Sequence, residues 1–586
     1  MKTTKRILMA AMGVTMAMTT VLAGCGGKPA STVAPKDETK TQLYVTTRDA
    51  GVGVEWLKTI SKMFEDKYEE VSFQTGKKGV QVYAEGEGML NSKTLLESMG
   101  KMPYNVIISE GVRPQVLQAQ GLVADMTDVV TGTMNFDKVD VNGEIVSIGE
   151  SKTIESIMYD EQKATLNIGG SYYGAPWGFA YAGITYDEKV WQLNKLYFAE
   201  DKDDAFYMED TISSYTGKTY TGRGFIQSNS QPKSVGPDGV RGSYDDGMPS
   251  SYEEFMYLCD YMAAEKGLAP LIITGVNNNE YTNKFVNAFA VALAGKEDFL
   301  VNFDSQTKKG NTVDIVTGFD GNTPIIEPME INAGNGYLMA QSAAKYYAYD
   351  LLDKVLVKNE ETYLSEFSGL TSHTDTQAYF VKSGNQTSFK RIGMIVEGSY
   401  WYNEAKSSIE STGDGTNSFK AFPIPRQLTG SVEEGKGTPF TVADELGMNA
   451  VINANTTDPD LLNLAKLFVR FAYTDECLAT FIECNSQPVM LKYQLPTARY
   501  NALSTYAKSQ IDVYENAVKD DAFVWPISTS TAYKKNASYY GLIHNSDFWK
   551  SSTYGYAYNA FATGKSVKEF FLDTKISQET WQKDFM

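Results

Sequence analysis

The chain has 586 residues, a formal net charge of −19 at pH 7 and four cysteines. The acidic excess argues against nucleic acid and anionic lipid surfaces as partners, because both are bound by clusters of Lys and Arg. The length exceeds that of one ordinary domain, so we expect two lobes with a large core.

The first residues have the order of a secretory signal. A basic segment precedes an apolar run from Ile7 to Leu22, which is short for a membrane-spanning helix. The sequence Leu-Ala-Gly-Cys25 resembles a bacterial lipobox, in which the chain is cut before a lipidated cysteine. We expect residues 1–24 to be a signal peptide and Cys25 to carry a lipid. An ordinary signal peptide cleaved near a cysteine is the alternative.

Residues 25–41 are rich in Gly, Pro, Ser, Thr and charged side chains, a composition that cannot bury a core. We expect a flexible tether here. No later run is long and apolar enough to span a bilayer. The remainder is therefore expected to be an extracytoplasmic body, held at the outer face of the cell membrane by two acyl chains.

Three cysteines remain for the folded body: Cys259, Cys477 and Cys484. The last two are seven residues apart in one expected helix, or roughly 10 Å along its axis, which is too far for a disulfide. All three lie in apolar contexts and are expected to be buried thiols. Their spacing matches no metal cluster.

The first half of the chain reads as βαβ units. We expect a strand at 42–47, a Gly-rich turn at 49–53, a helix over 57–68, and further strands at 80–82 and 105–109. Strand, helix and strand at this scale are typical of a mostly parallel sheet.

The pattern resumes later in the chain. Expected elements are a strand at 183–187, a helix from a capping box at Ser251 and Glu254 to about Gly267, a strand at 271–273, a long amphipathic helix over 460–483 and a last helix over 566–581. Between them, residues 198–248 form a polar insertion, which we interpret as an elaborated surface segment.

Within this insertion, residues 236–247 place three Asp among Gly residues. Oxygen-rich loops of this kind can bind calcium. The loop lacks the Asp-x-Asp-x-Asp-Gly order and the distal Glu of an EF-hand, so a pair of turns is the favoured interpretation. We expect no metal and no cofactor.

Several landmarks follow the lipobox in order. They are Trp56-Leu57, Gly79-Val-Gln-Val82, Asn105-Val-Ile-Ile108, Gly121-Leu-Val-Ala-Asp-Met126, Tyr173-Gly-Ala-Pro-Trp177, Gly183-Ile-Thr-Tyr-Asp187, Gly393-Met-Ile-Val-Glu-Gly-Ser-Tyr-Trp401, Phe422-Pro-Ile-Pro425 and Gly447-Met-Asn449. As an ordered set they make the chain similar to the family 1 extracellular solute-binding proteins, relatives of maltose-binding protein and receptors of carbohydrate ABC importers. The resemblance covers about residues 42–581.

The resemblance implies a two-lobed α/β fold, in which two three-layer α/β domains are hinged around a ligand cleft. By analogy, residues 42–178 plus 447–495 form the first lobe, and residues 179–446 plus 496–586 form the second. It also implies a carbohydrate ligand, with an oligosaccharide favoured, a membrane permease as partner, and a monomer.

A sugar receptor needs aromatic platforms for C–H faces and polar side chains for hydroxyl groups. Trp177 lies where the family crosses between lobes, with Tyr181 close by. Trp401 and Tyr400 match the position at which family members stack an aromatic ring on sugar. Trp525 lies in a C-terminal aromatic loop. Packing in a hinge or core is the alternative for each.

Polar candidates come from strand ends and crossovers. Arg48 and Asp49 follow the first strand, and Glu110 follows the strand at 105–109, at the carboxyl ends where open α/β sheets bind ligands. Further candidates are Glu397, beside the aromatic pair, and Asp444 and Glu445, at the second crossover. A solvated turn would equally explain the first pair, and a helix cap would explain Glu397.

Enzyme interpretations rank lower. The chain has two His residues, His373 and His544, without a His-Glu-x-x-His pair, and it lacks a Gly-x-Ser-x-Gly elbow and a complete phosphate loop. A glycosidase needs only two carboxylates on a sugar cleft, so this enzyme class stays open. Two kinds of binding protein also stay open: a surface glycan-binding lipoprotein without transport, and a receptor for a non-sugar solute such as a peptide.

Overall fold

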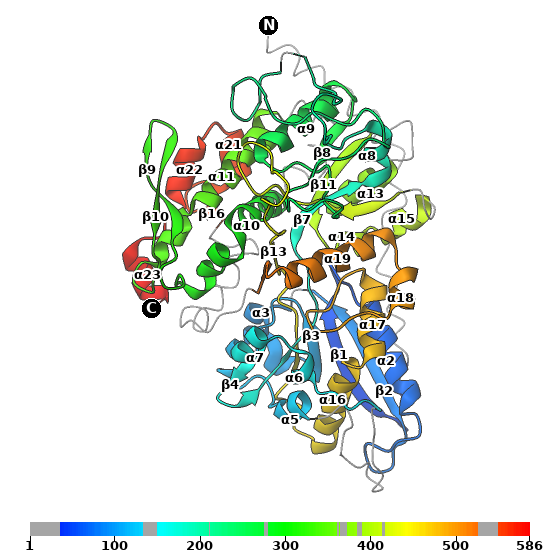
Figure 1. Cartoon of the computed structure of the whole chain (residues 1–586). Coiled ribbons are helices and arrows are strands. Elements are labelled where there is room, and N and C mark those ends of the chain that lie inside the picture. Colours follow the sequence, from blue (N-terminus) through cyan, green and yellow to red (C-terminus); the bar gives the residue numbers. More distant parts are fainter. Residues whose placement is uncertain are drawn as a thin grey trace, which may run out of the picture.

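The computed structural model describes residues 35–88, 90–132, 149–209, 211–274, 279–359, 363, 372–383, 390–412, 417–525 and 549–585. These residues form two α/β lobes, one above the other in Figure 1. The predicted signal peptide and Cys25 lie outside the described residues. Within them, no helix is long and apolar enough to cross a membrane.

The first lobe is built on a five-stranded sheet in the order β2-β1-β3-β14-β6. Its strands are β1 (Thr41–Arg48), β2 (Val80–Glu87), β3 (Val106–Ser109), β14 (Asn449–Ile452) and β6 (Ala175–Pro176). Strand β1 is parallel to β2 and β3, as the βαβ pattern predicts, whereas β14 returns late in the chain and runs antiparallel to β3. One sheet thus unites segments that are more than 300 residues apart in sequence.

Helices cover this sheet and close its core. The longest are α2 (Glu55–Lys67), α16 (Pro459–Ala472) and α17 (Asp475–Asn485); the shorter ones are α3 (Ser92–Ser98), η1 (Met99–Lys101), α4 (Pro114–Gln118), α5 (Thr127–Thr131), α6 (Ile154–Ile157) and α7 (Asp160–Leu166), with the strand pair β4 (Asn167–Ile168) and β5 (Ser171–Tyr172). In α2, Leu57, Ile60 and Phe64 are buried at helical spacing and pack into the same core as Phe468 of α16. The amphipathic face read from the sequence is therefore the face that holds the helix to its lobe.

The second lobe has a four-stranded sheet in the order β12-β7-β11-β8. Strand β7 is antiparallel to both β11 and β12, and only β11 and β8 are parallel, so the expectation of a mostly parallel sheet was wrong for this lobe. Its strands are β7 (Ala182–Asp187), β8 (Ala269–Ile272), β11 (Ile392–Gly398) and β12 (Phe419–Ala421). Every residue of β7, β8 and β11 is buried, which agrees with their continuous apolar runs.

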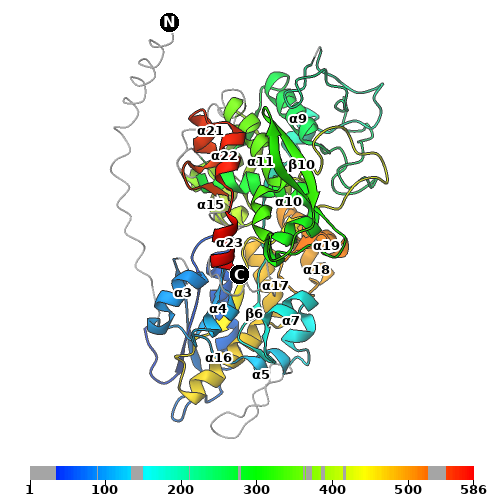
Figure 2. The ribbon, with the colours of Figure 1, turned by 90° about the vertical axis from the view of Figure 1, so that its left-hand side faces the viewer.

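The helices of this lobe include one long broken segment, α10 (Asn279–Asp304), which packs on α11 (Ala343–Leu352). The remaining elements are α8 (Glu188–Asn194), α9 (Tyr252–Ala264), η2 (Gly336–Gln341), η3 (Asp353–Lys358), α13 (His373–Ser383), α14 (Trp401–Glu404), α15 (Lys406–Thr412), α18 (Thr497–Ala502), α19 (Thr505–Lys519), α21 (Ala557–Ala562), α22 (Val567–Asp573) and α23 (Gln578–Phe585), with the strand pairs β9 (Val313–Asp320) and β10 (Thr323–Met329), β13 (Val442–Ala443) and β15 (Phe523–Val524), and β16 (Lys550–Ser551) and β17 (Gly555–Tyr556). Seen from the side, α23 lies at the level where the two lobes meet (Figure 2).

Two predicted helices are each divided in two. The segment 460–483 breaks after α16, where Thr474 takes an extended conformation (ψ 155°) and begins α17. At the break, the Tyr473 hydroxyl donates a hydrogen bond to the Pro176 carbonyl oxygen at 2.8 Å. The segment 566–581 breaks between α22 and α23. An apolar stripe continues across both breaks, so periodicity alone did not reveal them.

The polar insertion is anchored more deeply than a surface segment. Phe225 is fully buried and stacks on Tyr261 of α9 with ring centroids 3.8 Å apart. The buried Arg223 pairs with the Glu254 carboxylate at 2.5 Å. Because that carboxylate is held by Arg223, only half of the predicted capping box forms: Ser251 Oγ accepts from the Glu254 backbone N–H at 3.2 Å. The segment therefore combines an exposed surface with a buried anchor, and the anchor was not predicted.

The Asp-containing loop 236–247 folds on itself. The Asp245 carboxylate accepts hydrogen bonds from the Asp238 N–H at 3.0 Å and the Ser243 hydroxyl at 2.7 Å, and lies 3.7 Å from the Arg426 guanidinium. In the described part of the chain, no group of three or more His, Cys, Asp or Glu side chains could hold a metal ion.

The three cysteines of the folded body are free thiols in the structure. Cys259 and Cys477 are buried, and burial raises the pKa of each thiol above its ordinary value. Cys484 is only partly buried, so the prediction of three buried thiols was wrong for this residue.

Candidate ligand site between the lobes

Two chain segments that pass between the lobes run side by side. The Glu445 N–H donates to the Ala180 carbonyl at 2.6 Å, and the neighbouring Asp444 carboxylate accepts from the N–H groups of Gly447 at 2.8 Å and Leu446 at 3.1 Å. Asp444 is fully buried, and this burial raises its pKa to about 7. Its side chain therefore holds the crossover together, which is a structural role for a residue predicted to bind ligand.

The first lobe contributes an ion pair at the carboxyl ends of its parallel strands. Arg48 ends β1, Glu110 follows β3, and their side chains are in contact. The two strands are neighbours in the sheet, so these residues, far apart in sequence, meet at one edge. Glu110 is buried, while the Arg48 side chain keeps 31% of its surface exposed. Asp49, the third candidate here, is exposed and packs its side chain against Gly86.

The second lobe faces this pair with a buried lysine. The Lys284 ammonium donates to Glu445 Oε1 at 2.6 Å and to the Tyr400 hydroxyl at 2.8 Å. Burial lowers the pKa of Lys284, but Glu445 and Tyr281 raise it, and the net pKa lies above its ordinary value. Lys284 is therefore charged at neutral pH and joins helix α10 to the crossover.

Two further carboxylates lie beside this lysine. Glu397 lies near the end of β11 and Glu404 ends α14, and both accept hydrogen bonds from the Gln377 side-chain amide, at 3.2 and 2.9 Å. Burial, together with the negative charge of Glu404, raises the pKa of Glu397 well above its usual range. This shift favours the neutral acid form of Glu397, which can both donate and accept hydrogen bonds.

The lobes touch at this place through the turn after β1. The Gly51 N–H donates to Glu404 at 3.0 Å, and the Asn403 side chain donates to the Gly51 carbonyl at 2.9 Å. Gly51 has a φ of 64°, which favours glycine, and a Cβ at this position would lie 3.6 Å from the Tyr400 ring and 3.8 Å from Glu110. Both lobes therefore meet over one patch of polar side chains.

We call this patch the inter-lobe cluster. Its members are Arg48, Glu110, Lys284, Glu397, Tyr400, Glu404 and Glu445. Carboxylates outnumber cations in it, and the carboxyl ends of β1, β3 and β11 supply three of its residues. Such a set offers hydrogen-bond acceptors and donors of both signs, which suits a ligand with many hydroxyl groups.

The predicted tryptophan platforms lie elsewhere. Trp177 is fully buried in the first lobe, where it stacks on Trp56 with centroids 5.2 Å apart. Trp401 is fully buried in the second lobe and donates its indole N–H to Thr185 Oγ1 at 3.0 Å. In this conformation neither ring has surface to offer a ligand, because each was placed by packing inside its own lobe.

Two more aromatic candidates are packed as well. Tyr181 stacks on Phe179 at 5.7 Å and keeps 4% of its surface. Trp525, also 4% exposed, lies 4.9 Å from the Tyr159 ring of the first lobe and 4.3 Å from Phe523. Tyr400 alone among the predicted aromatics lies in the inter-lobe cluster.

Three residues of the site were missed at the level of sequence: Lys284, Glu404 and Gln377. Lys284 lies inside an apolar helix, and its partner Glu445 is 161 residues away. No local pattern announces such a pair. Glu404 could have been found, because it follows Tyr400 by four residues and therefore occupies the same face of a helical turn.

Comparison with family models finds no match, and comparison with curated proteins finds none either. Solved structures do match. The GacH receptor of Streptomyces glaucescens, solved in unliganded form and with acarbose, aligns over 94% of this chain and 99% of its own, with 12% identity and a TM-score of 0.50. Maltose-bound MalE3 of T. maritima aligns over 93% of this chain and 99% of its own, with 10% identity and a TM-score of 0.50.

These similarities show the fold. The chain has the two-lobed α/β architecture of solute-binding proteins, as the resemblance in its sequence implied. At such low identity the likeness carries no residue of either relative's binding site into this chain.

Proposed function

We propose that this protein is the substrate-binding lipoprotein of an ABC importer, which captures a carbohydrate, with an oligosaccharide favoured, between its lobes and delivers it to a membrane permease. The observation that carries the proposal is the inter-lobe cluster, because it joins the strand ends of both lobes in one polar patch. Open α/β sheets bind ligands at this edge. The two structural relatives were solved with acarbose and with maltose, which supports a sugar as the ligand class.

The proposed mechanism follows from the contacts between the lobes. Gly51 is held by Asn403 and Glu404, and Lys284 holds Glu445 and Tyr400. A ligand that replaces these contacts with its own hydroxyl groups, and touches both lobes, gains most in the closed state. Differential affinity for that state drives closure.

The direct test is a binding screen on the purified protein. Intrinsic tryptophan fluorescence would be titrated with mono- and oligosaccharides, and small-angle X-ray scattering would report the separation of the lobes. A ligand at 100 times its dissociation constant should stabilise the protein by about 2.7 kcal/mol. A saturable change with one sugar class, accompanied by a change in radius of gyration, is the expected result.

The same screen separates the competing functions. Binding of polymeric glycan without a change in radius of gyration would indicate a surface adhesin, and release of reducing ends would indicate a glycosidase. Silence across sugars with binding of oligopeptides would indicate a peptide receptor. Each of these outcomes contradicts the carbohydrate importer proposal.

The anchor is a separate part of the proposal. We propose that Cys25 is lipidated and holds the body at the outer face of the membrane, with residues 25–41 as a tether. Metabolic labelling with palmitate should mark the wild-type protein and not a Cys25→Ala variant, and Cys484→Ala is the matched control. Equal labelling of the Cys25→Ala variant would exclude this anchor.

A further inference from the structure

A hollow lies inside the second lobe, and none of the residues that line it belongs to the inter-lobe cluster. It has a volume of about 260 Å³ and is lined by residues of α10, of the β9–β10 hairpin and of α11. Helix α10 is broken at Gly295 (φ 72°, ψ 174°), and the lining residues come from both sides of the break. We call this hollow the α10 pocket and define it by Leu293, Asp298, Asp314, Ser342, Tyr347 and Leu428.

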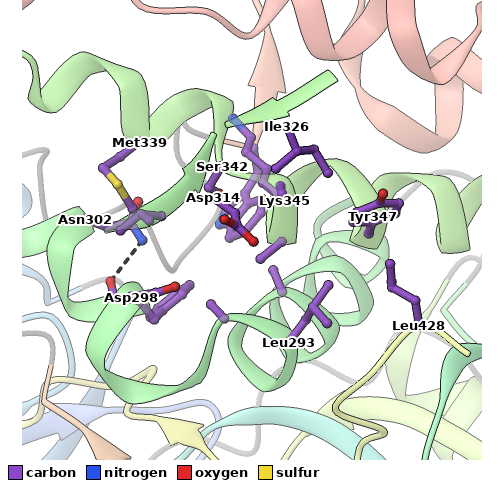
Figure 3. A pocket seen from close by; sticks show the side chains of 17 residues that line it. Leu293, Asp298, Asn302, Asp314, Ile326, Met339, Ser342, Lys345, Tyr347 and Leu428 are labelled. Atoms are coloured by element: carbon purple, nitrogen blue, oxygen red, sulfur yellow. Dashed lines mark hydrogen bonds between the residues drawn. The ribbon is translucent and has the colours of Figure 1, made fainter. Parts of the chain in front are cut away.

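One end of the α10 pocket is acidic and the other is apolar. Figure 3 shows Asp298 and Asp314 toward one side of the hollow and Tyr347 and Leu428 at the opposite side. Asp298 is half-buried and Asp314 is exposed, and neither carboxylate forms a hydrogen bond or an ion pair with another residue that the structure describes. The neighbouring Glu297 differs, because Lys308 holds it at 2.6 Å and Asn311 at 3.1 Å.

The negative charge of Asp314 raises the pKa of two groups that line the pocket. Burial and the charge of Asp314 raise the pKa of Asp298 to about 6. Burial and the charges of Asp350 and Asp314 raise the pKa of Tyr347. The lysine in the lining, Lys345, directs its ammonium to the Ala340 carbonyl and the Thr574 hydroxyl, both at 3.2 Å.

We propose that the α10 pocket binds a small organic ammonium ion with an apolar body. The ammonium would lie between Asp298 and Asp314, where charge-assisted hydrogen bonds are about twice as strong as neutral ones. The aromatic ring of Tyr347 and the side chains of Leu293 and Leu428 would contact the hydrocarbon part. The volume fits such a body, since a cavity of about 150 Å³ already accepts benzene. This proposal is independent of the sugar site.

The test uses 2-phenylethylammonium as the probe, in phosphate buffer free of other amines, with binding followed by titration calorimetry. The neutral control is 2-phenylethanol, which has the same body without the charge. We expect the ammonium to bind at least about tenfold more tightly than the alcohol, because only the ammonium can form charge-assisted hydrogen bonds with the two carboxylates.

Variants locate the binding. Asp298→Asn should weaken it about tenfold, and Leu293→Trp, which keeps both carboxylates and fills the hollow, should abolish it. Glu297→Gln is the matched control, because it removes a carboxylate of the same helix that is already paired with Lys308, and it should leave the affinity unchanged. Melting temperatures would confirm that each variant is folded.

Three outcomes would overturn the proposal. One is equal affinity for the alcohol and the ammonium, and another is an equal loss in Glu297→Gln. The third is stabilisation by Ca²⁺ that depends on Asp298 and Asp314 while the ammonium does not bind, since this would make the carboxylates a cation site. A sugar that fills the inter-lobe site should not displace the ammonium.

Discussion

The inter-lobe cluster and the α10 pocket differ in whether their charged side chains form ion pairs. In the cluster, Arg48 pairs with Glu110 inside the first lobe and Lys284 pairs with Glu445 at the crossover, while Gly51 makes the hydrogen bonds between the lobes. In the pocket, Asp298 and Asp314 are left facing a hollow. A ligand that binds the cluster must therefore replace hydrogen bonds between protein groups, including those of Gly51 that join the lobes. A ligand of the α10 pocket would enter a hollow that already exists.

The largest effect is expected from breaking the buried ion pair of the cluster. Lys284→Met leaves the Glu445 carboxylate, with 4% of its side chain exposed, without this cation. Removal of one partner of a buried pair costs about 3–5 kcal/mol. Urea unfolding would measure the decrease in the free energy of unfolding, separately for each lobe if the two lobes unfold in separate transitions.

Two comparisons sharpen this prediction. The double variant Lys284→Met with Glu445→Leu removes both charges and should recover much of the stability. Lys62→Met is the matched control, because its pair with Asp66 is on the exposed surface of α2. A decrease in unfolding free energy below about 1 kcal/mol in Lys284→Met would show that the Lys284–Glu445 pair contributes no more than an exposed surface pair, and would contradict the prediction.

The next effect concerns pH and the crossover. Burial raises the pKa of Asp444 to about 7, above its value in an unfolded chain. The folded state therefore binds more protons than the unfolded state between about pH 4 and 7, and the free energy of unfolding should fall as pH rises through this window. The contribution is at most about 4 kcal/mol, since each pKa unit corresponds to about 1.4 kcal/mol.

The Asp444→Asn variant tests this reasoning. Asn keeps one acceptor oxygen, which can serve either the Leu446 or the Gly447 N–H but not both, and it does not titrate. Its unfolding free energy should therefore vary less between about pH 4 and 7 than that of the wild type. Thermal melts at several pH values would measure both slopes. Equal slopes would show that the proton uptake lies on another group.

A smaller effect is expected for ligand affinity at the strand ends. If the cluster binds sugar, Arg48→Ala should weaken binding by about 10- to 100-fold, since a hydrogen bond to a charged group contributes roughly 1.5–3 kcal/mol. Its effect on stability should be smaller than that of Lys284→Met, because the Arg48 side chain is 31% exposed and the Lys284 side chain 10%. Fluorescence titration and thermal melts would separate the two. Unchanged affinity would move the sugar site away from β1.

The smallest effect has the opposite sign. Asp298→Asn removes one of two carboxylates that repel each other in the α10 pocket, so it should stabilise the protein without added ligand by up to about 1 kcal/mol at about pH 7.5. The benefit should decline as pH falls through about 6 and vanish below about pH 4, where Asp298 is protonated in both the folded and the unfolded state. Differential scanning calorimetry would measure it. A destabilised variant would show that Asp298 has a structural partner.

Sequence reasoning was strongest where local pattern and burial agree. The strands at 42–47, 105–109 and 183–187 were confirmed as β1, β3 and β7, and the overall two-lobed fold was confirmed by the solved structures. Apolar residues that recur with a period of two or of 3.6 indicate which face of a segment is buried. A strand or helix long enough to show this period can therefore be predicted from the sequence. The lobe boundaries and the lipid anchor stay predictions.

The sequence by itself thus determined most of the elements, the parallel pairing of β1 with β2 and β3, and the strand ends at which Arg48 and Glu110 lie. Only the tertiary structure decided which aromatics are packed and which face the cluster. Trp177 and Trp401 look like sugar platforms locally, yet both are buried in the cores of single lobes. Lys284 looks like an ordinary helical lysine, yet it binds Glu445 across 161 residues. Burial and long-range pairing depend on which surfaces the folded chain brings together, and no window of local sequence contains that information.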